Sequence, residues 1–154
     1  MAFTAGESVI GFIGTGVMGR SMAGHLMDAG FALRVHNRSK GKAQDLLDRG
    51  AKWADSPAEL APHCHAIFTI VGFPQDVEEV YFSPRGVFAG GVREGAVLVD
   101  MTTSRPDLAE RIARWASEQG AAALDAPVSG GDTGAREARL SIMVGGDEGA
   151  FRRV

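Results

Sequence analysis

A glycine-rich turn is the first part of this sequence whose residue types and spacing could do chemistry. Gly14-Thr15-Gly16-Val17-Met18-Gly19 has the pattern G-x-G-x-x-G and directly follows the apolar run Val9-Ile10-Gly11-Phe12-Ile13. In this pattern the first glycine permits a sharp turn, the second lets the backbone approach a pyrophosphate, and the third lets a helix pack closely on a sheet. Amides at the start of that helix attract phosphate oxygens. The turn therefore predicts a dinucleotide site; a turn whose glycines serve packing alone is the alternative.

Basic and polar residues follow at the distance where such a site holds the adenosine ribose. This corner reads Asn37-Arg38-Ser39-Lys40, and no Asp or Glu occurs between Phe31 and Gln44. A carboxylate there would bind a free 2′-hydroxyl and repel a 2′-phosphate, whereas guanidinium and ammonium groups donate charge-assisted hydrogen bonds to phosphate. We therefore expect NADP(H) in preference to NAD(H), with NAD still possible. A solvated, basic helix start is the alternative.

Apolar runs alternate with amphipathic stretches along the chain. The strands and helices that they predict must position the glycine-rich turn and the basic corner that follows it. Strands are predicted over residues 9–13, 31–36, 52–54, 66–71, 96–99, 121–124 and 140–144. Helices are predicted over residues 17–29, 40–49 and 75–81, and after caps at Ser56-Pro57-Ala58-Glu59 and Ser104-Arg105-Pro106-Asp107. This alternation predicts an α/β fold, a doubly wound, mostly parallel sheet of the Rossmann type.

Length and composition limit the other possibilities. The chain has 154 residues, 45% apolar and 23% charged, so residues 1–154 suit one dinucleotide-binding domain. The formal net charge of −3 leaves no broad positive surplus, so we expect no nucleic-acid partner. No apolar run could cross a membrane, and the single cysteine cannot form an internal disulfide, so we expect no membrane partner and a cytoplasmic location.

Further motifs follow the glycine turn in order along the chain. They are Val71-Gly72-Phe73-Pro74, Asp100-Met101-Thr102-Thr103, Asp125-Ala126-Pro127-Val128-Ser129-Gly130-Gly131 and Leu140-Ser141-Ile142-Met143-Val144-Gly145-Gly146. Together with the turn they resemble the β-hydroxyacid dehydrogenases. That family includes 3-hydroxyisobutyrate dehydrogenase, tartronate semialdehyde reductase and the glyoxylate/succinic semialdehyde reductases, with 6-phosphogluconate dehydrogenase a more distant relation. The resemblance runs from about Val9 to the last residue.

The resemblance implies hydride transfer between a nicotinamide and a small β-hydroxy acid or semialdehyde. It places the pyrophosphate at the glycine turn and the ribose phosphate at Asn37, Arg38 and Ser39. It implies that the adenosine side is lined by Val71, Gly72, Phe73 and Pro74, with Val77 behind them, and that Thr103 lies by the nicotinamide. It also implies a small-molecule carboxylate substrate held by Ser129, Gly130 and Gly131. A Ser-Gly-Gly turn after a strand is expected to expose amides in any case, with a merely flexible connection as the alternative.

The sequence departs from the family's pattern in two places. Ala138 stands where the family usually has glycine, and the family's catalytic lysine is expected in a helix beyond Val154, the last residue. The lysines here are Lys40, Lys42 and Lys52, all around the second predicted strand. The resemblance therefore implies no catalytic residue in this chain, a domain truncated near its end, and no all-helical C-terminal domain. We expect a homo-oligomer when that domain is present, and self-association through uncovered apolar residues when it is absent.

Several other residues receive no role in the chemistry. His63-Cys64-His65 offers too few ligands for a zinc cage, so we predict no metal site and an exposed loop there. Asp100 and Asp125 are expected to accept hydrogen bonds from loop amides at strand ends. His25 and His36 are expected at the surface or the cofactor rim. A non-enzymatic NADP(H)-binding module and an imine reductase of the same superfamily remain open as alternative functions.

Overall fold

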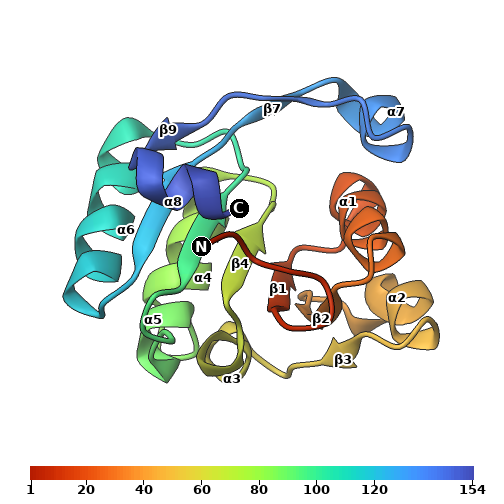
Figure 1. The fold of residues 1–154 in the computed structure, drawn as a ribbon, viewed down its shortest axis with the longest axis horizontal. Helices are drawn as coiled ribbons and strands as arrows, with labels where there is room; N and C mark the ends of the chain where they lie inside the picture. The colour runs from red at the N-terminus through yellow and green to blue at the C-terminus, as the bar shows by residue number, and fades with distance from the viewer.

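Seven strands form one sheet in the computed structural model, which describes residues 1–154 (Figure 1). The strands are β1 (Val9–Ile13), β2 (Ala32–His36), β3 (Lys52–Trp53), β4 (Ala66–Thr69), β5 (Val97–Asp100), β6 (Ala122–Asp125) and β9 (Gly145–Gly146). Their order is β3-β2-β1-β4-β5-β6-β9, with β1 to β6 parallel and β9 antiparallel to β6. This is the strand order of a dinucleotide-binding fold, and it confirms the predicted doubly wound, mostly parallel sheet.

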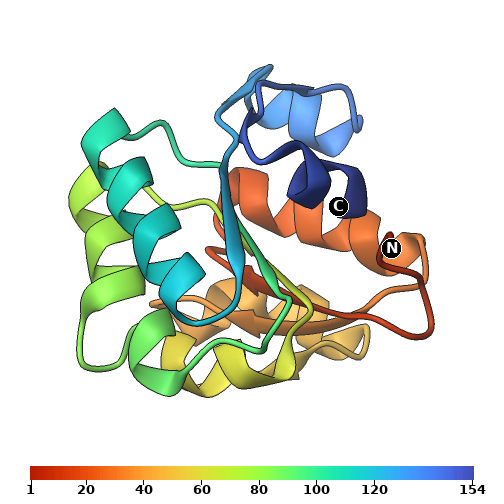
Figure 2. The same ribbon diagram turned by 60° about the vertical axis from the view of Figure 1, so that its left-hand side comes forward.

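Helices cover both faces of the sheet (Figures 1 and 2). On one side lie α1 (Val17–Asp28), the 3₁₀ turn η1 (Lys40–Ala43) and α2 (Gln44–Asp48). On the other lie α3 (Pro57–Leu60), the 3₁₀ turn η2 (Ala61–His63), α4 (Pro74–Phe82), α5 (Val87–Gly90) and α6 (Pro106–Glu118). Successive strand residues point to opposite faces: Ile10 and Phe12 pack toward α1 and α2, and Ile13 packs toward α4. Because β1 is buried on both faces, the glycine turn that follows it lies at the middle of the edge where the parallel strands end.

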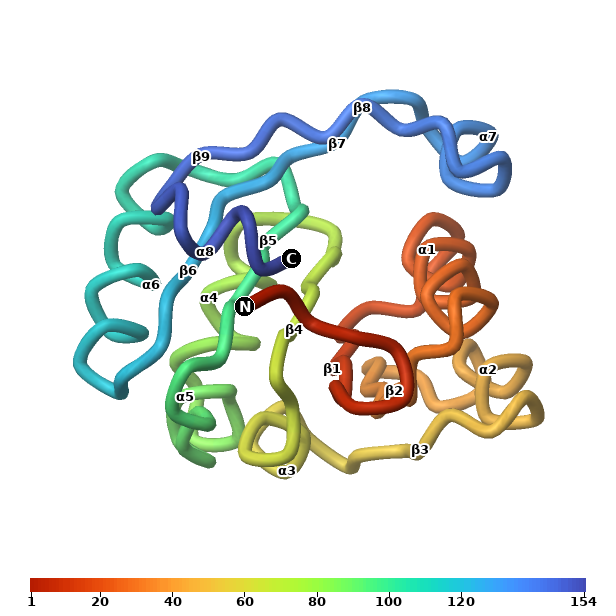
Figure 3. Tube along the Cα trace, viewed as in Figure 1, coloured from red at the N-terminus to blue at the C-terminus, as the bar shows by residue number.

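The C-terminal segment forms an arm that reaches back over α1 (Figure 3). β7 (Val128–Ser129) and β8 (Ser141–Ile142) pair antiparallel outside the main sheet, and α7 (Gly131–Arg136) lies between them. His25 of α1 contacts the Ala135 carbonyl through Nε2 at 2.8 Å. This contact ties α7 to α1.

A last helix, α8 (Glu148–Arg153), brings the C-terminus beside the N-terminus. The Phe3 amide donates to the Arg153 carbonyl at 2.9 Å, and the Val154 amide donates to the Phe151 carbonyl at 3.3 Å at the end of the helix. The catalytic lysine that the family resemblance implies beyond Val154 therefore lies outside the residues that the structure describes, and its place stays a prediction.

The structure corrects three of the predicted elements. Of the single strand expected over 140–144 only the two residues of β8 are a strand, and they pair with β7 outside the main sheet; the chain then leaves this pairing, and β9 joins the edge of the main sheet beside β6. The expected helix over 40–49 begins as a 3₁₀ turn, and Ser129-Gly130-Gly131, for which a merely flexible connection was the alternative, leads directly into the helix α7. Ser104 does not cap α6: Arg105 is the N-cap residue, and the Ser104 hydroxyl is buried without a partner.

The exposed loop expected at His63-Cys64-His65 is also wrong for Cys64. Its side chain is fully buried, the thiol donates to the Leu60 carbonyl at 3.3 Å, and burial raises the pKa of the thiol to about 12. His65 accepts the Val9 amide through Nδ1 at 2.9 Å. The segment therefore anchors the start of β1 and β4.

Ala138→Gly is expected to raise the free energy of unfolding by about 0.5–1 kcal/mol. Ala138 is the only residue other than glycine with a positive φ, at 55°. This conformation costs an L-residue about 1–2 kcal/mol, whereas glycine adopts it freely. Glycine loses somewhat more backbone entropy on folding, which offsets part of the gain. Urea unfolding measures the change. Ala135→Gly, within α7 and buried, is the matched control and should destabilise instead. Destabilisation by Ala138→Gly would contradict the argument.

Candidate functional site

A cleft of about 830 Å³ opens where the strand order reverses, beside the ends of β1, β2 and β4. Ligands of doubly wound sheets bind at this position. The structure brings many of the predicted cofactor residues into its wall: Gly14, Gly16, Val17, Met18, Gly19, Asn37, Arg38, Ser39, Val71 and Gly72. Residues distant in sequence thus meet because β1 lies between β2 and β4.

The glycines of the turn have three different surroundings. Gly14 has φ +98°, and a Cβ there would lie 1.9 Å from the Ile70 carbonyl oxygen. A Cβ on Gly19 would lie 1.9 Å from the Gly14 carbonyl oxygen, whereas a Cβ on Gly16 would meet no protein atom within 4 Å. The first and third glycines are therefore required by the protein's own packing. The second keeps open the space where a ligand would contact the start of α1.

Thr15 and Asn37 join the turn to the corner after β2. The Thr15 amide donates to Asn37 Oδ1 at 2.9 Å, and Asn37 Nδ2 donates to the Ser39 carbonyl at 2.9 Å. Asn37 therefore positions the turn as well as lining the cleft. The Thr15 hydroxyl is buried and has no hydrogen-bond partner. Gly16 is the N-cap residue of α1, and no side chain caps the amides at the start of this helix. An unpartnered hydroxyl and uncapped helix amides beside an open glycine fit an anionic ligand.

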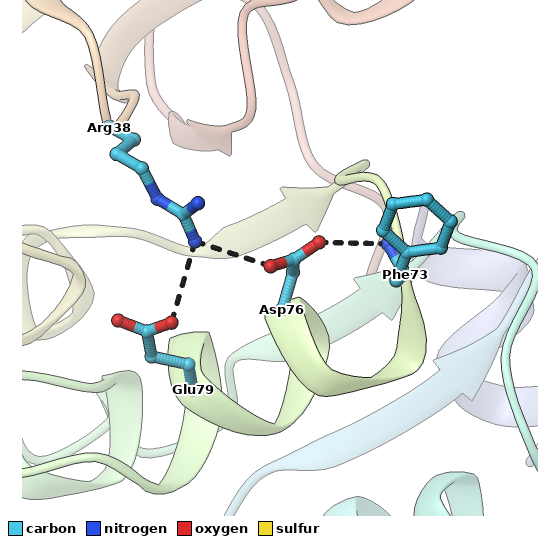
Figure 4. A network of polar contacts seen from close by, with 4 residues as sticks. All are labelled: Arg38, Phe73, Asp76 and Glu79. Atoms are coloured by element: carbon cyan, nitrogen blue, oxygen red, sulfur yellow. Dashed lines mark hydrogen bonds and ion pairs between the residues drawn. The ribbon is translucent and has the colours of Figure 1, made fainter.

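The corner after β2 contains negative charges that the local sequence did not reveal. Arg38 Nη2 donates to Asp76 Oδ1 at 3.2 Å and to Glu79 Oε2 at 3.4 Å, reaching from the loop after β2 across to α4 (Figure 4). Both carboxylates line the cleft, together with Lys40 and Lys42. Thus the cleft holds cations from the β2 side and carboxylates from the α4 side.

Some predicted cofactor residues lie outside the wall of the cleft. Phe73 is 69% exposed and lies on the far side of Asp76 from Arg38 (Figure 4). Val77 is fully buried in the core beneath α4, so it lies behind the wall of the cleft, and its contribution to the adenosine side stays a prediction. Pro74 starts α4, and Thr103 is exposed in the loop after β5.

Thr102, which the sequence did not single out, links the loops after β4 and β5. Its hydroxyl accepts the Val71 amide at 3.0 Å, and its own amide donates to Asp100 Oδ1 at 3.0 Å. Asp100 therefore accepts a loop amide, as predicted. Burial raises the pKa of Asp100 to about 6, with a further upward contribution from Asp125. This buried carboxyl holds the loop that contains Val71 and Gly72.

The predicted substrate residues lie on the arm rather than in the cleft. Ser129 pairs with Ser141 between β7 and β8, and Gly130 and Gly131 have φ of +135° and +62° at the start of α7. Both positive φ values favour glycine. None of these residues lines the cleft, so the structure does not bring them into one cavity with the cofactor residues.

His25 and His36, expected at the surface or the cofactor rim, each contact a backbone carbonyl oxygen. His36 lines the cleft and contacts the Ala54 carbonyl through Nδ1 at 2.9 Å, while His25 holds the arm. No group of three His, Cys, Asp or Glu side chains is arranged to hold a metal ion. None of the helices is both long and apolar enough to traverse a bilayer.

Comparison with known proteins settles the family. The model of the NAD binding domain of 6-phosphogluconate dehydrogenase matches residues 9–154. The chain belongs to this family. A probable 3-hydroxyisobutyrate dehydrogenase-like 1, mitochondrial, from Arabidopsis thaliana is 53% identical over 151 residues, which are 98% of this chain and 45% of that protein.

Solved structures that are similar to this chain have the same fold. Psf3 in complex with NADP+ and 2-OPP is 35% identical with a TM-score of 0.85, and the match covers 93% of this chain and 50% of that chain. A Streptomyces aurantiacus imine reductase is 26% identical with a TM-score of 0.79, covering 94% of this chain and 49% of that one. The chain thus spans about half the length of the relatives it matches, and it is an NAD-binding domain of a dehydrogenase family.

Proposed function

We propose that the chain is the NADP(H)-binding part of an oxidoreductase that transfers a hydride between nicotinamide and a small β-hydroxy acid or semialdehyde. The observation that carries the proposal is the cleft itself. Gly16 leaves open space at the uncapped start of α1, and Arg38, Ser39 and Lys40 lie in the same cleft. The similarity to 3-hydroxyisobutyrate dehydrogenase-like proteins supports the reaction class.

The chain's own residues would bind and orient the cofactor. The amides after Gly16 and the Thr15 hydroxyl would hold the pyrophosphate, because both lack partners within the protein. Arg38 and Ser39 would hold the ribose phosphate. Thr102 would keep the Val71-Gly72 loop in place against the cofactor. The nicotinamide, when bound, supplies the hydride; the protein supplies position and electrostatics.

We further propose that a lysine beyond Val154 handles the proton. Lys40 and Lys42 line the cofactor cleft, and Lys52 lies on β3, at the opposite edge of the sheet from β9. A general acid must lie within hydrogen-bond reach of the oxygen that it protonates. The three lysines of this chain are therefore assigned to the cofactor side or to the far edge of the sheet rather than to the substrate.

The substrate carboxylate would lie at Ser129, Gly130 and Gly131. Their amides and hydroxyl suit an anion, and the positive φ of both glycines turns the backbone at the start of α7. Binding of a small carboxylate at this turn is a proposal that rests on the family resemblance and on this local geometry.

Two alternatives and two further expectations belong to this proposal. The similarity to an imine reductase favours that activity as the second candidate, and turnover of small β-hydroxy acids against cyclic imines discriminates between them. A non-enzymatic module would bind the cofactor without either activity. We also propose a homo-oligomer when the C-terminal domain is present, and self-association without it through exposed apolar residues such as Ile142, Met143 and Phe151. A cytoplasmic location is proposed as well, with a mitochondrial one as the alternative that a relative's name raises.

Calorimetric titration with NADPH and NADH tests the cofactor assignment. NADPH is expected to bind about tenfold or more tightly, because a charge-assisted hydrogen bond to phosphate contributes about 1.5–3 kcal/mol. Arg38→Asp is expected to reverse the preference. Arg93→Asp, an exposed residue outside the cleft, is the charge-matched control and should leave the preference unchanged. Equal affinities of the parent protein for both nucleotides would defeat the assignment.

A further inference from the structure

Two carboxylates on α4 contact the arginine that would hold the ribose phosphate. Arg38 Nη2 lies 3.2 Å from Asp76 Oδ1 and 3.4 Å from Glu79 Oε2 (Figure 4). Neither interaction was visible in the sequence around Arg38, since the partners lie 38 and 41 positions away. The corner of the cleft therefore contains groups of both signs.

The two carboxylates differ in what else they do. Asp76 uses its second oxygen, Oδ2, to accept the Phe73 amide at 3.0 Å, so it also caps the start of α4. The side chain of Glu79 makes no other hydrogen bond and is 65% exposed. Asp76 is thus part of the local fold, whereas Glu79 can be changed without loss of a helix cap.

The contact leaves most of the Arg38 guanidinium available. Only Nη2 contacts the carboxylates, and the Nε and Nη1 donors face no protein partner. A phosphate that accepts hydrogen bonds from Nε and Nη1 would be separated from the Glu79 carboxylate by about the width of the guanidinium group. Because a ribose phosphate carries more than one negative charge, each carboxylate repels it more strongly than it repels a neutral hydroxyl.

Positioning of Arg38 by the carboxylates acts in the opposite direction but is weaker. Arg38 is 77% exposed, and exposed ion pairs hold a long side chain only slightly. A carboxylate can also accept a hydrogen bond from a free 2′-hydroxyl, which a phosphorylated ribose lacks. Repulsion of the phosphate and acceptance of the hydroxyl both favour NAD(H) over NADP(H).

We propose that Glu79, supported by Asp76, is a specificity-determining residue that opposes Arg38 and reduces the preference of the cleft for a 2′-phosphorylated cofactor. This inference rests on the proposed function, because it concerns how the same cleft chooses between two nicotinamide nucleotides. Arg38 attracts the phosphate from one wall, and Glu79 repels it from the other. The ratio of affinities, rather than either affinity alone, reports their balance.

The test is titration of the 154-residue chain and its Glu79→Gln variant with NADP+ and NAD+, and with adenosine 2′,5′-bisphosphate and 5′-AMP. Glu79→Gln is expected to increase the preference for the 2′-phosphorylated member of each pair about three- to tenfold. The increase should shrink in about 1 M salt, where charges are screened within about 3 Å. Glu78→Gln is the matched control: it removes the same charge from the neighbouring position, which pairs with Arg111 at 2.8 Å and does not line the cleft.

The outcomes separate the two claims. A larger preference in Glu79→Gln than in Glu78→Gln supports the role of Glu79. An unchanged or smaller preference in a protein that still binds both nucleotides overturns that role and leaves the proposed function intact. Absence of binding by the folded parent chain to any of the four nucleotides overturns the proposed function, and the inference falls with it.

Discussion

Gly14→Ala is expected to lower the free energy of unfolding by about 2–5 kcal/mol. The new Cβ would lie 1.9 Å from the Ile70 carbonyl oxygen, and alanine would have to adopt φ +98°. Overpacking against backbone costs about 1–3 kcal/mol or more, and the left-handed conformation adds about 1–2 kcal/mol. Neither Gly14 nor Ile70 can move freely, because each is bonded into the sheet edge through His36 and Ile13. Urea or thermal unfolding measures the loss.

Gly16→Ala is the matched control, two residues along the same turn. Its Cβ meets no protein atom within 4 Å, and the φ of −70° is ordinary for alanine. Alanine is less favoured than glycine at the N-cap position, which lowers the free energy of unfolding, but alanine also reduces the entropy of the unfolded chain, which raises it. The two effects nearly cancel, so the free energy of unfolding should change by less than about 1 kcal/mol. Nucleotide binding should weaken sharply, because the methyl group occupies the ligand's space. Equal stability of the two variants would show that the turn does not have the geometry described.

The glycine turn was predictable from sequence because its causes are local. The positive φ of Gly14 and the packing of Gly19 against the Gly14 carbonyl both arise within the turn, whereas the approach of Gly14 to Ile70 comes from the pairing of β1 with β4. The apolar run before the turn and the amphipathic stretch after it have different periods. The proline at the start of α3 and the helix stop at Gly30 are equally local signals. The strand order then follows from alternating strands and helices with right-handed crossovers.

Other parts of the site depend on contacts between distant residues. Whether a carboxylate lies near Arg38 is decided by where α4 stands across the cleft from the loop after β2, so the residues around Arg38 in the sequence do not predict Asp76 and Glu79. The place of Thr102 depends on the β4–β5 pairing, which brings its hydroxyl to the Val71 amide. The two short strands β8 and β9 carry too few residues for a period to be read. Ala138 is the exception: a departure from the family's glycine pointed to the one strained alanine.

Stability is expected to fall by about 3 kcal/mol as pH rises from about 4 to above about 6, owing to Asp100. Its side chain is buried among β5, β6 and α6, and burial raises its pKa from 3.8 to about 6, with repulsion from Asp125 adding to the rise. A group whose pKa is higher in the folded protein favours the folded state while protonated. That contribution is present below the ordinary pKa and is lost as the pH passes through the raised one.

Asp100→Asn isolates this contribution. The amide oxygen can still accept the Thr102 amide, as Asp100 Oδ1 does at 3.0 Å, but the side chain no longer takes up charge. The free energy of unfolding, measured by urea at several pH values, should therefore lose most of its decline between about pH 4 and pH 6, and the variant should be more stable than the parent above about pH 6. Asp107→Asn, an exposed carboxylate in the first turn of α6, is the charge-matched control and should retain the parent's decline. If the stability of both variants still declines between about pH 4 and pH 6, Asp100 is not the source of that decline. Asp100→Asn can also loosen the Val71-Gly72 loop, because the loop is held through Thr102. In that case nucleotide affinity will fall even where stability rises.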